Sequence, residues 1–289
     1  KIFKFPFSLK WSKNFKDKIQ SVTLLNIKKL KLNMKNVSSL VNGIYVAQNN
    51  IIVRNSKFLS DYTIENNLIT FWSKNSRLSN SSLDYKGKIY LKPFDLIIDL
   101  DLDKMNLKSF LNSRENIKEI FKLESLYNNS FSASILLNIK KIINNKLFQK
   151  SKIFINFNNG NVNFNNSFLS NEKTGKLNLY SSALEIVNGE LIFKGNFNFI
   201  VNNKKEFFKV FQIPKKHRFN LENIFFDIEV NMFANKLKIN DIKLNNLKDS
   251  SNEYIQIILD EYNSFEGNKI KNWVGLKNFM SRIFESYLG

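Results

Sequence analysis

Cysteine is absent from this chain of 289 residues, so neither disulfides nor thiolates contribute to its structure or chemistry. Histidine occurs once, at His217, where the flanking Lys216 and Arg218 make it a poor metal ligand and a poor general base. With no other histidine and no cysteine, no Ser-His-Asp or Cys-His set can be assembled elsewhere in the chain. The nine glycines stand singly, which excludes a Gly-rich phosphate loop. We therefore expect a protein that is not an enzyme and has no cofactor.

Long apolar runs are also missing. The densest stretch, residues 94–102, is interrupted by Asp95, Asp99 and Asp101, and no run approaches the ~20 apolar residues of a membrane-spanning helix. The spacing of Asp99, Asp101 and Asp103 resembles a calcium site, but leucines lie between them and the glycine turn is absent. We assign these aspartates to the polar face of a strand. Because the chain starts at Lys1 without a signal peptide, we expect an N-terminal anchor or signal to be missing.

Basic residues far outnumber acidic ones, 44 to 25, and give a net charge of +19. This excess favours anionic partners such as phospholipid headgroups, lipopolysaccharide or nucleic acid. The heavy use of Lys, Asn, Ile and Phe is equally typical of an AT-rich genome. A nucleic-acid site would need a basic stripe with exposed aromatics. Here the lysines are spread along nearly every strand, so we expect no nucleic-acid partner.

Between residues 44 and 244 the chain repeatedly alternates apolar and polar residues. Clear examples are Val162-Asn163-Phe164-Asn165, Leu177-Asn178-Leu179 and Phe197-Asn198-Phe199. A period of two places apolar side chains on one face of a strand and polar side chains on the other. The pattern predicts a mainly β protein whose sheet has one apolar face and one polar face.

Turn signals divide this pattern into hairpins. Asn159-Gly160 and Asn188-Gly189 fit type I′ turns, which need positive φ at both central positions. We also predict a hairpin over Ile44–Arg54 with Asn49-Asn50 at its turn. At Lys92-Pro93 the apolar parity switches, which predicts a bulge between two strand segments.

Three segments change to helical spacing. They are residues 107–126, Lys204–Phe211 ahead of Pro214, and the chain beyond Lys248. The apolar stripe of 273–288 either packs on the sheet or lies on a membrane. We predict a β-rich body over 1–248 and a helical tail over 249–289.

Residues 150–244, and a stretch further upstream, resemble the AsmA-like family of bacterial envelope proteins, whose relatives include YhdP and TamB. The segments that carry the resemblance are Ile153–Phe164, Thr174–Leu179, Glu190–Phe197, Phe207–Arg218 and Gly87–Leu96. The likeness lies in the pattern of strands and turns, and the family has no catalytic residue to carry over.

The resemblance implies an elongated, curved antiparallel sheet, shaped like a groove or taco, with short capping helices. It also implies a periplasmic body anchored to the inner membrane by the missing N-terminal segment, and phospholipid transport that supports outer-membrane biogenesis. The expected partners are phospholipid or another anionic envelope lipid and a membrane surface. The alternative is a structural scaffold that docks onto an outer-membrane partner protein without carrying lipid.

If lipid is the ligand, acyl chains bind the apolar strand face while headgroups stay in water, and each buried CH₂ contributes roughly 0.8 kcal/mol. The candidate lipid-binding residues are Phe94, Leu96, Ile98, Ile153, Ile155, Phe157, Leu191, Phe193, Phe197, Phe199, Ile228, Val230 and Met232. The competing interpretation is a closed sandwich, in which these side chains pack against a second sheet.

A basic cluster near the predicted short helix is the candidate headgroup or membrane contact. It comprises Lys204, Lys205, Lys209, Lys215, Lys216 and Arg218. Phe207, Phe208 and Phe211 are interleaved with it, so the alternative is a capping helix with buried phenylalanines and solvated lysines.

Overall fold

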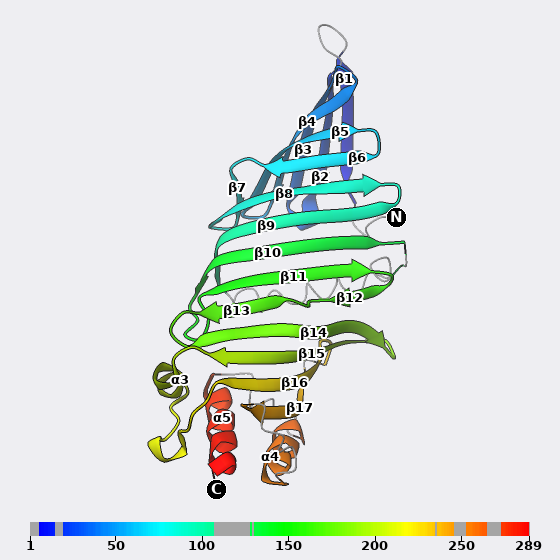
Figure 1. The fold of residues 1–289 in the computed structure, drawn as a ribbon. Helices are drawn as coiled ribbons and strands as arrows, with labels where there is room; N and C mark the ends of the chain where they lie inside the picture. The colour runs from blue at the N-terminus through cyan, green and yellow to red at the C-terminus, as the bar shows by residue number, and fades with distance from the viewer. Residues whose placement is uncertain are drawn as a thin grey trace. The chain divides into compact units, whose positions relative to one another are not determined.

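A computed structural model describes residues 6–14, 20–106, 128, 130–234, 236–245, 253–264 and 273–288. The fold is mainly β, with few helices, as the alternating sequence predicts (Figure 1). Contacts divide the chain into two compact units, Lys1–Met105 with Asn129–Lys141, and Asn106–Asn128 with Ile142–Gly289. The predicted helix over 107–126 lies outside the described residues.

The first unit is an antiparallel meander in which successive strands pair in chain order. β6 and β7 share the position between β5 and β8. Its elements are β1 (Ser8–Asn14), β2 (Gln20–Ile27), the 3₁₀ turn η1 (Lys28–Leu30), β3 (Leu32–Val41), β4 (Ile44–Val53), β5 (Ser56–Glu65), β6 (Leu68–Ser73), β7 (Ser76–Leu78), β8 (Ser81–Leu91), β9 (Phe94–Asn106) and β10 (Ser132–Ile143).

The second unit continues the antiparallel pattern and adds helices. β12 and β13 share the position between β11 and β14, and β14 to β17 pair in chain order. Its elements are β11 (Lys150–Asn158), β12 (Asn161–Asn163), β13 (Ser167–Asn171), β14 (Gly175–Val187), β15 (Glu190–Val201), α3 (Lys204–Phe211), the 3₁₀ turn η3 (Lys215–His217), β16 (Asn223–Asn231), β17 (Lys236–Leu244), α4 (Glu253–Ser264) and α5 (Trp273–Leu288).

Two turn predictions are confirmed, whereas the prediction of a third turn and that of a bulge are wrong. Asn159-Gly160 and Asn188-Gly189 have positive φ throughout, as type I′ turns require. Asn49 and Asn50 instead lie inside β4, paired with strands on both sides. The predicted bulge at Lys92-Pro93 is a tight turn joining β8 to β9, because Leu91 pairs directly with Phe94. The residues on either side of a two-residue turn, here Leu91 and Phe94, point to the same face of the sheet. The apolar positions therefore change from odd-numbered to even-numbered at this turn, as they would at a bulge.

A row of polar side chains crosses the more apolar face of the first unit. Strand register aligns Thr23, Asn36, Asn49, Ser60 and Ser73 across five strands. The Asn36 amide donates a hydrogen bond of 2.7 Å to the Tyr62 hydroxyl. This face is therefore apolar only in part.

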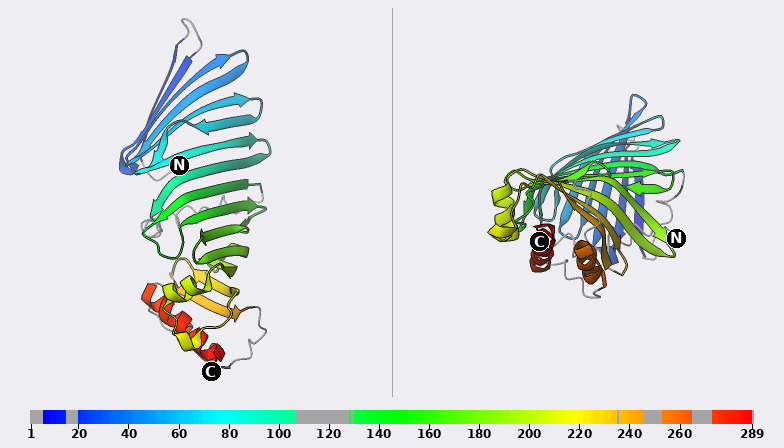
Figure 2. Two further views of the ribbon diagram at one scale, coloured as in Figure 1. Left: turned by 60° about the vertical axis from the view of Figure 1, so that its left-hand side comes forward. Right: turned by 60° about the horizontal axis from the view of Figure 1, so that its bottom comes forward.

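The apolar stripe of the tail is buried within the second unit, where Phe279 and Phe284 of α5 are 0% exposed. α4 contacts β17 and α5, and α5 contacts α3 and η3 (Figure 2). The Asn263 side chain on α4 both accepts from the Ile239 amide and donates to the Ile239 carbonyl. It thereby satisfies backbone groups of β17 that a neighbouring strand would otherwise pair.

The packing of α5 generates a stability prediction. Phe284 is 0% exposed and its ring lies 5.5–6.2 Å from those of Phe207, Phe208 and Phe219. We expect Phe284→Ala to lower the free energy of unfolding by about 3–5 kcal/mol, since it leaves a large cavity. Val274 on the same helix is 61% exposed, and Val274→Ala should cost under about 1 kcal/mol. Urea unfolding measures both, and equal losses would contradict the packing of α5.

Candidate apolar binding site

One face of strands β14 to β17 is apolar in successive cross-strand rows. Leu179 lies opposite Phe197, which lies opposite Phe226. The next row on one side is Leu177, Phe199, Ile224 and Leu244. On the other side, beyond the row that contains Gly195 and Ile228, lies the row of Leu184, Phe193, Val230 and Leu237. We call these three rows, together with Ile242 opposite Phe226, the apolar face.

Two irregularities in strand pairing keep this face continuous. In β14 the register shifts between Leu179 and Ser181, so Leu177 and the even-numbered Leu184 point to the same side. The pairing of β16 with β17 shifts between Asp227 and Ile228 and has the same effect. A bulge changes which parity faces one side. Strict alternation along the sequence would therefore assign half of β14 and half of β17 to the wrong face.

Helices α3 and α5 cover one part of the apolar face. Phe207, Phe208 and Phe211 of α3 are buried, and the Phe207 ring lies 5.4 Å from that of Phe199. Phe279 and Met280 of α5 are also fully or almost fully buried. The phenylalanines of the basic cluster are thus core residues, as its structural interpretation predicts.

The part of the face nearer the β14–β15 turn holds a first cavity of about 280 Å³. Most of its lining side chains are only half-buried. The lining consists of Ile153, Phe164, Ser167, Phe168, Leu169, Leu177, Leu179, Leu184, Leu191, Phe193, Phe197 and Met232. Ser167 is the one polar side chain among them, and its hydroxyl is already bonded to the backbone of Phe154.

Beneath the helices lies a second cavity of about 270 Å³, which shares Leu177 and Phe197 with the first. No charged, hydroxyl or amide side chain lines it. Its lining consists of Leu147, Phe148, Leu177, Phe197, Phe199, Phe207, Phe211, Ile224, Phe226, Ile228, Leu237, Ile239, Leu276, Phe279 and Met280. The two cavities therefore adjoin along the apolar face.

Gly195 lies beneath two lining residues of the first cavity, Phe193 and Leu179, and leaves space for their side chains. A Cβ atom at this position would lie 2.9 Å from Cζ of Phe193 and 3.1 Å from Cδ1 of Leu179. The Phe193 ring can lie over the backbone only because residue 195 has no side chain.

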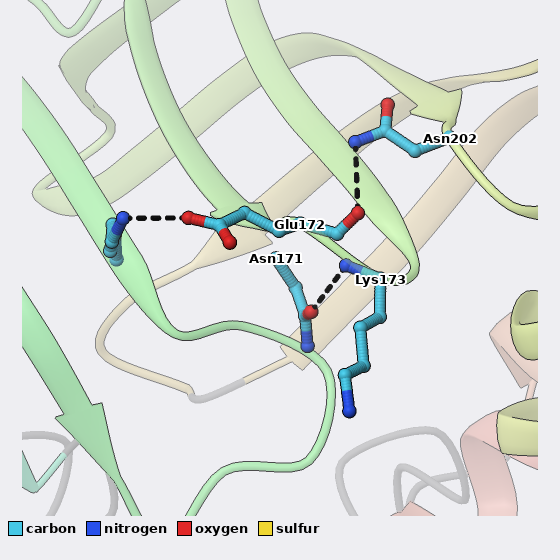
Figure 3. A network of polar contacts seen from close by, with 5 residues as sticks. Asn171, Glu172, Lys173 and Asn202 are labelled. Atoms are coloured by element: carbon cyan, nitrogen blue, oxygen red, sulfur yellow. Dashed lines mark hydrogen bonds and ion pairs between the residues drawn. The ribbon is translucent and has the colours of Figure 1, made fainter.

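A network of polar contacts at the β13–β14 turn holds the segment that supplies Leu147 and Phe148. Thr174 donates a hydrogen bond of 3.2 Å to the Leu147 carbonyl. The Asn171 side chain accepts a hydrogen bond of 2.9 Å from the Lys173 amide (Figure 3). The Asn202 side chain donates to the Glu172 carbonyl at 3.5 Å. The network orients one wall of the second cavity.

The structure brings together many of the predicted lipid-binding residues. Ile153, Leu191, Phe193, Phe197 and Met232 line the first cavity, and Phe197, Phe199 and Ile228 line the second. Ile155, Phe157 and Val230 share the strand parity of lining neighbours but line neither cavity.

The other predicted residues lie elsewhere. Phe94, Leu96 and Ile98 are on β9 of the first unit, where Phe94 stacks on Phe131 at 5.5 Å. Apolar and polar residues alternate in β9 as they do in the strands that line the cavities. The alternation alone therefore cannot distinguish the β9 residues from the cavity-lining residues.

None of the predicted headgroup residues lines either cavity. Lys204 bonds Asn220, Lys209 lies 4.0 Å from Glu206, and Arg218 donates to the Ile213 carbonyl at 2.8 Å. Lys205, Lys215 and Lys216 are exposed on α3 and η3. The basic cluster therefore lies on and around α3 and η3, outside the lining of both cavities.

Sequence reasoning missed the lining residues that the helices supply, above all Leu276, Phe279 and Met280. The helical stripe in 273–288 signals that these residues are buried, but not which part of the sheet they cover. It also missed Leu177, Leu179 and Leu184, although Leu177-Asn178-Leu179 is among the clearest alternating segments.

The described residues also bear on two other features, a metal site and a membrane-spanning helix. Within the described ranges, no group of three or more His, Cys, Asp or Glu side chains is arranged to hold a metal ion. Asp101 accepts a hydrogen bond of 2.9 Å from Asn138, as a strand-surface residue would. Among the helices that the structure describes, none has the length and apolar character to cross a membrane.

Comparison with models of protein families, with curated proteins and with solved structures finds no match for this chain.

The β13–β14 turn generates a pH prediction. A hydrogen bond of 2.9 Å from Lys150, together with its positive charge, holds the pKa of Glu172 below its ordinary range. The stabilising contribution is therefore present above the ordinary carboxyl pKa and is lost as pH falls through the lowered value. We expect Lys150→Met to return the pKa of Glu172 to its ordinary range in a carboxyl NMR titration. Lys173→Met is the control, and equal shifts in both variants would contradict the pairing.

Proposed function

We propose that this protein is a non-enzymatic lipid-binding protein whose second unit holds the acyl chain of a phospholipid or another anionic envelope lipid. The observation that carries the proposal is the pair of adjoining apolar cavities on one face of β14–β17. The lining offers hydrocarbon contact and almost no hydrogen-bonding group. Such a surface suits an alkyl chain better than a polar metabolite or a peptide backbone.

The dimensions of the apolar face support an acyl chain. Leu191 and Phe199 of β15 point to the same side of the sheet and lie eight residues apart, which corresponds to about 27 Å. One leaflet of a bilayer core is about 15 Å thick, half of ~30 Å. A single chain laid along this face would therefore remain in apolar contact over its length.

The charge of the protein supports an anionic headgroup. The net charge of +19 raises the local concentration of anionic lipid near the protein. Because no cation lines the cavities, the headgroup would remain in solvent at the half-exposed side of the first cavity. Affinity would then come from the chain, with little selection among anionic headgroups.

The resemblance to AsmA-like proteins supports the cellular setting of the proposal. In that setting the protein is periplasmic, is anchored to the inner membrane through a segment outside this chain, and supplies phospholipid for outer-membrane biogenesis.

Binding is tested with a matched pair of variants on β15. Phe193 lines the first cavity, whereas Ile200 is 43% exposed and has the opposite strand parity. We expect Phe193→Asp to weaken binding of a fluorescent phospholipid by at least about tenfold, because a carboxylate in the cavity must be desolvated. Ile200→Asp should bind as the unaltered protein does.

The measurement uses detergent-free titration together with mass spectrometry of lipid that copurifies with the protein. Absence of lipid from the unaltered protein in both assays would refute lipid binding and leave the scaffold alternative. Equal loss in the two variants would refute the assignment of the site.

A further inference from the structure

The two cavities differ in what surrounds them. No residue of a described helix lines the first cavity, whereas α3 and α5 supply Phe207, Phe211, Leu276, Phe279 and Met280 to the lining of the second. α3 and α5 therefore cover part of the second cavity on the side away from the sheet. A headgroup entering it would lose its hydration without gaining a polar partner. Only the hydrocarbon end of a ligand suits this space.

We propose that the second cavity is a compartment beneath α3 and α5 for the terminal part of one acyl chain, and that α5 acts as a ruler that sets the length of chain that fits. This inference rests on the proposed function and adds to it the orientation of the bound chain and selection by chain length. The headgroup stays beside the first cavity, and the chain passes between Leu177 and Phe197, the residues common to both linings. Its methyl end meets Leu276, Phe279 and Met280.

The volume fits part of a chain rather than a whole lipid. An apolar cavity of ~150 Å³ takes up benzene, which has six carbons. By proportion, 270 Å³ accommodates roughly ten carbon atoms, and the two cavities together accommodate roughly twice that number. The space under α5 therefore has room for the distal half of one long chain, and a second chain of the same lipid would have to lie elsewhere.

Polar contacts along the edge of α5 fix the position of this helix over the second cavity. Lys277 donates to the Gln212 side chain at 2.7 Å, which joins α5 to the end of α3. Arg282 lies 2.7 Å from Glu261 of α4, and the Tyr287 hydroxyl accepts from the Leu244 amide of β17 at 3.2 Å. With three neighbouring elements holding it, α5 sets a defined depth for the compartment.

Chain-length selectivity is tested by filling the compartment from two sides. Leu276 on α5 and Leu237 on β17 both line it and are half-buried, so Leu276→Trp and Leu237→Trp add volume with limited disruption. Val274→Trp adds an indole to the exposed side of α5 and is the control. The probes are saturated fatty acids of about 10 to about 18 carbons, for which each buried CH₂ contributes about a fourfold gain in affinity.

We expect the affinity of the unaltered protein to rise with chain length and then level off. Each filling variant should lower affinity for the longest chains by about tenfold or more and leave the shortest nearly unchanged. Val274→Trp should follow the unaltered profile. If the unaltered protein binds no fatty acid, the proposed function fails. If the unaltered protein binds fatty acids and both filling variants show the same dependence of affinity on chain length, lipid binding stands. The proposal that α5 limits chain length is then wrong.

A second measurement leaves the cavity lining unaltered. The Trp273 ring lies 5.4 Å from that of Phe211, which lines the second cavity. Trp11 and Trp72 are exposed residues of the first unit, so Trp11→Phe with Trp72→Phe isolates the fluorescence of Trp273. A spin label near the methyl end of a bound fatty acid should quench Trp273 more strongly than one near the carboxylate. Equal quenching, or the reverse order, would overturn the proposed direction of the chain.

Discussion

The apolar face of β14–β17 is the feature on which the rest of the second unit depends. Strand alternation and two register shifts direct its leucines and phenylalanines to one side of the sheet. An apolar sheet face must be covered by another layer or left in contact with water. Here α3 and α5 cover one part and leave the other half-exposed, and the two adjoining cavities follow from that incomplete cover.

Burial of aromatic rings, rather than surface charge, holds the helical cover in place. Phe207 contacts Phe199 on the sheet and Phe284 on α5, and so joins three elements. The ion pair between Arg282 and Glu261 is partly exposed, and such pairs contribute only about 0–1 kcal/mol. Polar contacts therefore set the orientation of α5, while its apolar stripe supplies most of the stability of the packing.

Local signals predicted local structure well. Asn203 caps α3 by accepting from the Glu206 amide, and the helix spans Lys204–Phe211 as its periodicity predicts. Asn-Gly pairs mark two turns correctly because few residues adopt positive φ at both positions. The Asn49-Asn50 prediction failed because pairing with strands on both sides outweighs the turn preference of asparagine. For the site, alternation indicated Phe193 and Phe197 but also Phe94, which belongs to the other unit.

The sequence by itself determines the mainly β class, the helix that follows β15 and the separation of each strand into an apolar and a polar side. These properties depend on periods of two and 3.6 residues, which are local. Only the tertiary structure decides which apolar side chains are covered and which line a cavity. Leu276 and Phe197 line the same compartment from distant parts of the chain. Their meeting depends on where α5 packs against the sheet, and this depends on shape and burial between elements rather than on any pattern within one of them.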